Sequence, residues 1–197
     1  MTIYRDFCAR IELPVRISEV HDYILRKGVV DEISYFEVDA DPEILRGQFQ
    51  LIAPVPRPYC QPHRIARISF SRLLPPVEKR LVVVKELLHV FDDQHAEAST
   101  KEEVNQLIAE IVAPQTLTAS VPTASDRLTE VLALAVLLPK AAVDAFRPAI
   151  GEGHISPEEV ATIARIPERY GRFVFSPVWR EILEQLASSS ENQRAAE

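Results

Sequence analysis

The segment PPVEKRLVVVKELLHVFDD, residues 75–93, decides which fold this chain can adopt. It opens with two prolines, which suit the first turn of a helix because no N–H group is needed there. At 100° per residue its apolar side chains cover most of the helix circumference; they are Val83, Val84, Leu87, Leu88, Val90 and Phe91. A helix that is apolar nearly all round is a buried helix. The sequence therefore predicts a central helix on which the other elements pack.

The polar side chains of this segment gather on one side of the predicted helix. With Lys85 placed at 0°, the set is His89 at about 40°, Asp92 at about −20°, Asp93 at about 80° and Glu86 at about 100°. Buried charges need partners of opposite charge, and these groups can pair with one another. One interpretation is a purely structural cluster of ion pairs. The other is a chemical site, because titratable groups in unusual surroundings also gather at functional sites.

Three short segments before the central helix have the residue patterns of strands. They alternate apolar with polar residues or carry β-branched and aromatic side chains; they are 34–38 (SYFEV), 47–53 (GQFQLIA) and 66–71 (ARISFS). The connection 54–64 holds four prolines, so neither a helix nor a central strand is expected there. We predict a small sheet whose last two strands are joined by a long exposed loop.

Helices make up the remainder of the predicted architecture. One precedes the strands at 16–27, with Ser18 as its cap and Gly28 where a helix stop belongs. The others follow the central segment; they are 99–114, 125–139, 140–150, 156–166 and 177–187. This order indicates an α+β fold, with a small, mostly antiparallel sheet of about three strands packed on a helical core. We expect a single domain over 1–187 and a disordered tail at 188–197.

Composition limits the chemistry available to the chain. Of its 197 residues only five are glycine and two are cysteine, Cys8 and Cys60. The glycines form no G-x-G-x-x-G or G-x-x-x-x-G-K-[ST] phosphate loop, and the absence of C-x-x-C argues against a zinc ribbon. A net charge of −7 argues against direct binding of nucleic acid. No apolar run reaches membrane-span length and no signal peptide is visible, so we expect a cytoplasmic protein.

The string KELLH, residues 85–89, has the form of H-E-x-x-H with lysine in place of the first histidine. In the intact motif the two histidines bind zinc and the glutamate activates water. Residues 66–71 precede it as a strand, and DRLTEVLALAVLLP (126–139) and ISPEEVATIARIPERYGRFV (155–174) follow it. In order and spacing these four segments resemble the ImmA/IrrE family of metallopeptidases, over roughly residues 30–175.

The resemblance implies a zincin-like core and a role for each matching residue. His89 matches the second zinc-binding histidine and Glu86 the catalytic general base. Asp126 matches the third ligand, one methylene shorter than the usual glutamate. Lys85 stands where the first histidine should be, and a protonated lysine cannot ligate zinc. Its ammonium could instead replace the charge of the metal between Glu86 and Asp126, in which case no cofactor is expected.

Three functions are compatible with these residues. The first, which we expect, is a pseudopeptidase that binds a protein partner; the resemblance suggests a helix-turn-helix transcriptional repressor, on a mobile element or in a stress response. The second is an active zinc endopeptidase with a non-standard ligand set, completed by His95 or His63. The third is a structural protein on the same scaffold. In zincin-like folds an extended substrate joins the sheet edge beside the motif helix, and 47–53 or 66–71 could supply that edge.

Overall fold

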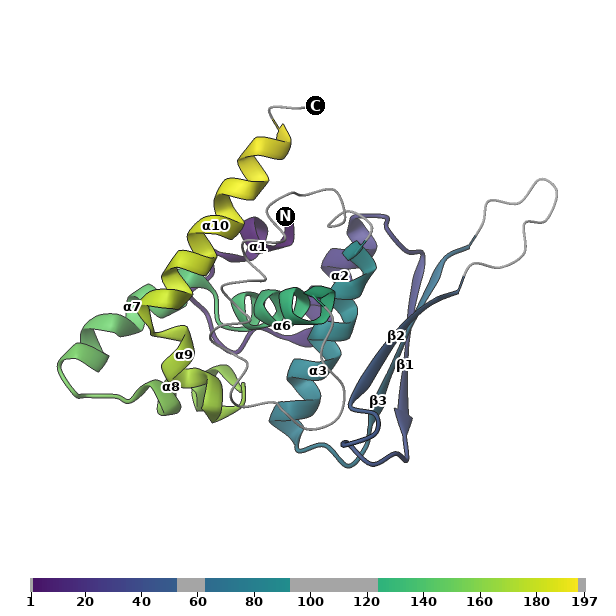
Figure 1. Ribbon diagram of the computed structural model, residues 1–197, viewed down its shortest axis with the longest axis horizontal. Helices are drawn as coiled ribbons and strands as arrows, with labels where there is room; N and C mark the ends of the chain where they lie inside the picture. Colours follow the sequence, from purple (N-terminus) through teal and green to yellow (C-terminus); the bar gives the residue numbers. More distant parts are fainter. Residues whose placement is uncertain (1, 53–62, 93–123, 195–197) are drawn as a thin grey trace.

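A three-stranded sheet and a stack of helices meet at one central helix (Figure 1). The structure is a computed structural model that describes residues 2–52, 63–92 and 124–194. The predicted helix at 99–114 and almost all of the proline-rich connection 54–64 therefore lie outside the described residues. Within the described part of the chain, no helix is long and apolar enough to cross a membrane.

The sheet consists of β1 (Glu32–Val38), β2 (Gly47–Ile52) and β3 (Ile65–Ser71), in the spatial order β1-β3-β2. The α+β class and the three predicted strands are confirmed. The sheet is mixed instead of mostly antiparallel, because β3 pairs antiparallel with β2 but parallel with β1. The chain reverses direction at each connection, as expected. Since β3 lies between the other two strands, however, the first and third strands become parallel neighbours.

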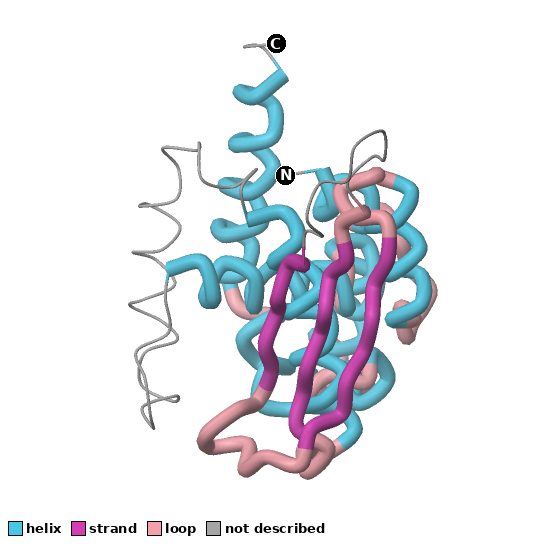
Figure 2. The backbone as a smooth tube through the Cα atoms, turned by 90° about the vertical axis from the view of Figure 1, so that its right-hand side faces the viewer, coloured by secondary structure: helices cyan, strands magenta, loops and turns pink. Residues whose placement is uncertain are grey.

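The predicted helices that fall within the described ranges are present in the predicted order, and the structure adds two short helices, at 2–7 and 171–174, and two short 3₁₀ turns labelled η. Together they are α1 (Thr2–Phe7), α2 (Ile17–Arg26), α3 (Pro76–Leu88), η1 (His89–Phe91), α6 (Ala124–Leu137), α7 (Lys140–Gly151), α8 (Pro157–Ala164), η2 (Glu168–Tyr170), α9 (Gly171–Val174) and α10 (Pro177–Arg194). The last helix extends beyond its predicted end at residue 187. Seen from the side, the helices cover one face of the sheet (Figure 2).

Local signals set most of the helix ends. Ser156 caps α8, and its side chain accepts a hydrogen bond from the Glu159 N–H while the Glu159 carboxylate accepts one from the Ser156 N–H. Gly28 follows α2 with a φ of 66°, a conformation that glycine adopts without strain. The cap predicted at Ser18 is wrong. Helix α2 already begins at Ile17, and its N-cap backbone N–H, on Arg16, is bonded by the Glu19 carboxylate.

Helix α3 is buried as predicted, between the sheet and α6 (Figure 1). Seven of its residues are buried; they are Leu81, Val82, Val83, Val84, Glu86, Leu87 and Leu88. On the sheet side it meets the buried β3 side chains, and on the other side it packs on α6, where every residue from Val131 to Leu137 is buried. Glu86 is therefore a carboxylate inside the hydrophobic core, which requires partners close at hand.

Candidate functional site

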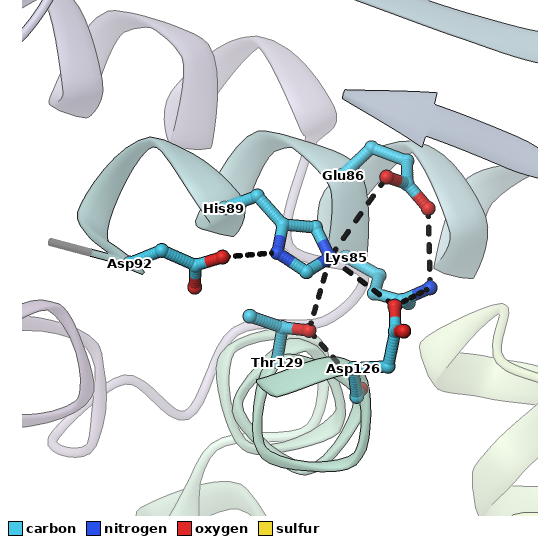
Figure 3. Close-up of polar contacts among 6 residues, drawn as sticks. All are labelled: Lys85, Glu86, His89, Asp92, Asp126 and Thr129. Atoms are coloured by element: carbon cyan, nitrogen blue, oxygen red, sulfur yellow. Dashed lines mark hydrogen bonds and ion pairs between the residues drawn. The ribbon is translucent and has the colours of Figure 1, made fainter. Parts of the chain in front are cut away.

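Four side chains singled out by the sequence come together where α3 crosses the first turn of α6 (Figure 3). Lys85 and Glu86 belong to the last turn of α3, His89 begins η1, and Asp126 lies near the start of α6. The helical spacing brings the first three to one side of α3, as expected from the 3.6-residue repeat. The packing of α6 against α3 then adds Asp126 from across the interface.

Lys85 is the cation between the two carboxylates. Its Nζ lies 3.2 Å from Oε1 of Glu86 and 3.0 Å from Oδ1 of Asp126. Burial by itself would lower the lysine pKa, but the charges of Glu86 and Asp126 and the hydrogen bonds to them outweigh it and raise the pKa. Lys85 is thus held in its protonated form. The side chain of Glu86 is only 4% exposed, so this ion pair is largely shielded from water.

His89 is held at both ring nitrogens. Its Nδ1 lies 2.8 Å from Oδ2 of Asp92, and its Nε2 lies 3.3 Å from Oγ1 of Thr129, 3.5 Å from Oδ1 of Asp126 and 3.9 Å from Oε2 of Glu86. Burial lowers the His89 pKa, but hydrogen bonds to Asp126 and Asp92 and the charge of Glu86 outweigh it, and the pKa rises to about 9. His89 is therefore an imidazolium that donates from both nitrogens at neutral pH.

Strand β2 closes the site from the sheet side. A Cβ atom on Gly47 would lie 2.4 Å from Cγ1 of Val82 and 2.8 Å from Oε1 of Glu86, so only glycine fits there without displacing α3. Two residues further on, the Phe49 ring stacks near His89, with 6.2 Å between ring centroids and 26° between the planes. The edge strand thus passes directly over the charged cluster.

Three contributors to the site were missed by sequence reasoning. Thr129 is fully buried; its hydroxyl donates to the Asp126 carbonyl 3.1 Å away, and its oxygen accepts from His89. Its position one turn after Asp126 on α6 is the one signal that could have pointed to it. Gly47 and Phe49 carry no such signal, because their proximity to α3 depends on how the sheet packs.

Of the two histidines proposed as accessory metal ligands, the structure describes only His63. His63 lies on the sheet side, and its half-exposed ring has Nε2 at 3.2 Å from Oε2 of Glu32 on β1. It lies two residues before β3, whose first residue, Ile65, pairs with Glu32. His95 lies outside the described residues.

As arranged, the donors do not fit a catalytic zinc centre. Such a centre needs three ligand atoms with free lone pairs and an open position for water. Here an ammonium lies against the Asp126 carboxylate, and both nitrogens of His89 already face hydrogen-bond partners. Among the described residues, no group of three or more His, Cys, Asp or Glu side chains has the arrangement of a metal site.

Comparisons of the chain with protein-family models, with curated proteins and with solved structures find no match. The resemblance to ImmA/IrrE metallopeptidases therefore depends on the quoted motifs, and it stays a prediction.

Proposed function

We propose that this chain is a cytoplasmic regulatory protein on a metallopeptidase-like scaffold, in which Lys85 takes the place of zinc and a protein partner is bound without being cleaved. The observation that carries the proposal is the position of the Lys85 ammonium, 3.0 Å from Asp126 and 3.2 Å from Glu86. These are the residues that the motif alignment assigns to the third metal ligand and to the general base.

The environment of Glu86 supports binding over hydrolysis. A general base must reach the water molecule whose proton it accepts. One oxygen of Glu86 faces the Lys85 ammonium, the other faces the His89 ring, and the side chain is 4% exposed. With a cation beside each oxygen, the shielded carboxylate has little room for a water molecule. The cluster favours a fixed structural charge network over a reacting base.

Strand β2 supports the choice of an extended peptide as the bound segment. It pairs with β3 on one side only, so it is an edge strand of the described sheet, whereas β3 is central. An unpaired strand edge can accept an extended segment by main-chain hydrogen bonding. Because Gly47 and Phe49 lie beside Glu86 and His89, a peptide added there would run along the cluster. A helix-turn-helix repressor is the partner class that the family resemblance suggests.

Metal content tests the first half of the proposal. The protein is purified without chelators in zinc-supplemented medium, and zinc per chain is measured by elemental mass spectrometry. We expect far less than one zinc per chain, because the ammonium of Lys85 repels a dication from the two carboxylates. Zinc near one equivalent per chain would overturn the proposal and favour an active endopeptidase.

Binding of a partner is tested with a charge-balanced double variant, Lys85→Met with Glu86→Gln. Affinity capture from the native host, quantified by mass spectrometry, should recover a protein with the wild type and lose it with this variant. The matched control is Lys140→Met with Asp144→Asn, which removes an exposed ion pair on α7. Circular dichroism confirms that each variant is folded. Equal capture by both variants would favour a structural protein whose interactions do not use the cluster.

A further inference from the structure

A hollow lies on another side of α3, away from the Lys85 cluster. The loop before α2, the first turn of α2, helix α3 and the end of α8 enclose a pocket of about 570 Å³. That volume falls in the range of small-molecule sites. Its charged lining residues are Arg10, Glu12, Arg16, Glu19, Arg80 and Arg165, and the rest of its wall is apolar. Arg80 projects from α3 about 140° round the helix from Lys85, so the two sites are separate.

The pocket carries an excess of positive charge in a chain whose net charge is −7. Arg10 and Glu19 form an ion pair with each other. The lining as a whole holds four arginines and two carboxylates, and the charge of Glu19 also acts on Arg16 and Arg80. Like charges that share a partly enclosed site repel one another, because they are less screened there than in water. The pocket is therefore complementary to an anion.

Arg80 has a buried hydrogen-bond donor that lacks an acceptor within the described part of the chain. One of its terminal nitrogens donates to the Val15 carbonyl, but its Nε–H is buried and has no acceptor among the described residues. Burial and the nearby charge of Arg165 lower the pKa of the Arg80 guanidinium. A buried donor without an acceptor is destabilising, so a ligand oxygen at this point would remove a cost that the free protein carries.

We propose that this pocket binds a small molecule that carries a phosphate group. Guanidinium forks match the oxygens of phosphate and can bond two of them at once. The first turn of α2 also lines the pocket, and the positive end of a helix favours an anion. The apolar part of the wall, which includes Ile17, suits the uncharged remainder of a metabolite. This inference does not depend on the proposed partner-binding function, because the two sites share no residue.

Titration with inorganic phosphate tests the proposal on the full chain, with potassium acetate at equal ionic strength as the control anion. Phosphate should raise the midpoint of thermal unfolding in a saturable way, and acetate should not. Arg165→Asn and Arg80→Met should each weaken phosphate binding by about tenfold or more, measured by calorimetry. Arg72→Asn removes an exposed arginine outside the pocket and should bind phosphate like the wild type.

The variants are chosen so that folding does not decide the outcome. Arg165 has a φ of 55°, a left-handed conformation that asparagine adopts more readily than most residues. Arg80→Met keeps much of the buried stem of Arg80, and if it fails to fold, Arg165→Asn alone tests the site. Equal phosphate affinity in Arg165→Asn and Arg72→Asn would overturn the proposal. So would a response to acetate as large as that to phosphate, or binding of phosphopeptides without binding of inorganic phosphate.

Discussion

In the proposed metal-free site, Lys85 brings one positive charge where zinc would bring two, and His89 supplies the second. The two cations, Lys85 and the His89 imidazolium, face the carboxylates of Glu86, Asp126 and Asp92 within 3.9 Å. Removing one member of such a buried network leaves an uncompensated charge, which is strongly destabilising. In its protonated form His89 could not bind a metal, because an imidazolium has no lone pair to offer.

On the proposed motif alignment, completing the motif should create a metal site. In the double variant Lys85→His with Asp126→Glu, the cation is gone and His89 can lose its proton, so three ligand side chains become available around Glu86. We expect about one zinc per chain by elemental analysis, with proton release on binding. Lys140→His, on the exposed face of α7, serves as the control and should bind none. A folded double variant without zinc would contradict the motif alignment.

The protein should lose stability as the pH becomes alkaline, because His89 is protonated in the folded state. Its pKa rises from 6.5 to about 9 on folding. A group whose pKa is raised by folding stabilises the protein fully below its unfolded-state pKa. This stabilisation is lost as the pH rises through its folded-state pKa. The free energy of unfolding should thus fall by roughly 3 kcal/mol between about pH 6.5 and 9.

Urea unfolding at a series of pH values measures this loss. The decline should be absent in His89→Gln, whose side chain keeps hydrogen-bonding capacity without titrating. It should persist in His154→Gln, which changes an exposed histidine outside the cluster. The same slope in both variants would show that His89 is not the group responsible.

At the scale of elements, the contact between β2 and α3 determines how the edge strand meets the cluster. The sequence predicts both elements correctly, because the apolar run of α3 and the alternation in β2 are local patterns. It does not predict that Gly47 lies against Glu86, since a strand pattern fixes which residues share a face but not what lies opposite them. Glycine at this point permits an approach that any Cβ would prevent.

Gly47→Ala should therefore push β2 away from α3 and weaken the fold. The new Cβ would lie 2.4 Å from Val82 and 2.8 Å from Glu86, and overpacking of this kind costs about 1–3 kcal/mol. Chemical denaturation measures the loss. Gly151→Ala is the matched control, because an added Cβ meets nothing within 4 Å at that position. It should leave stability unchanged or raise it by up to about 1 kcal/mol; equal losses in the two variants would contradict the close approach.

For the whole molecule, the α+β class follows from the order of local patterns, whereas the arrangement of strands does not. Alternating residues in β1, β2 and β3 are the same whether β3 lies at the edge or in the centre, so the parallel pairing with β1 was out of reach. The same limit applies to the site. Helical periodicity brings Lys85, Glu86 and His89 together, while Asp126 could be placed only through a family resemblance, because its approach depends on packing between α3 and α6.

One carboxylate links the sheet side of the molecule to its C-terminal helices. Glu78, in the first turn of α3, accepts a hydrogen bond from Arg46, which precedes β2, over 2.7 Å. It also accepts hydrogen bonds from both terminal nitrogens of Arg169 in η2. Tyr170 beside it then donates to Glu130 of α6. Burial raises the pKa of Glu78, but the hydrogen bonds and charges of the two arginines outweigh it and lower the pKa.

Glu78→Gln should thus loosen the molecule as a whole. The side chain of Glu78 is only 14% exposed, and two arginines would lose their counter-charge, so we expect a loss of roughly 2 kcal/mol in urea unfolding at pH 7. Because folding lowers its pKa, the contribution of Glu78 is present above its unfolded value and lost as the pH falls. The difference in the free energy of unfolding between Glu78→Gln and the wild type should therefore become smaller at acid pH. Glu37→Gln breaks an exposed pair with Lys79 and should change stability by less than about 0.5 kcal/mol. If Glu37→Gln loses as much stability as Glu78→Gln, the contacts of Glu78 do not stabilise the fold more than an exposed ion pair does.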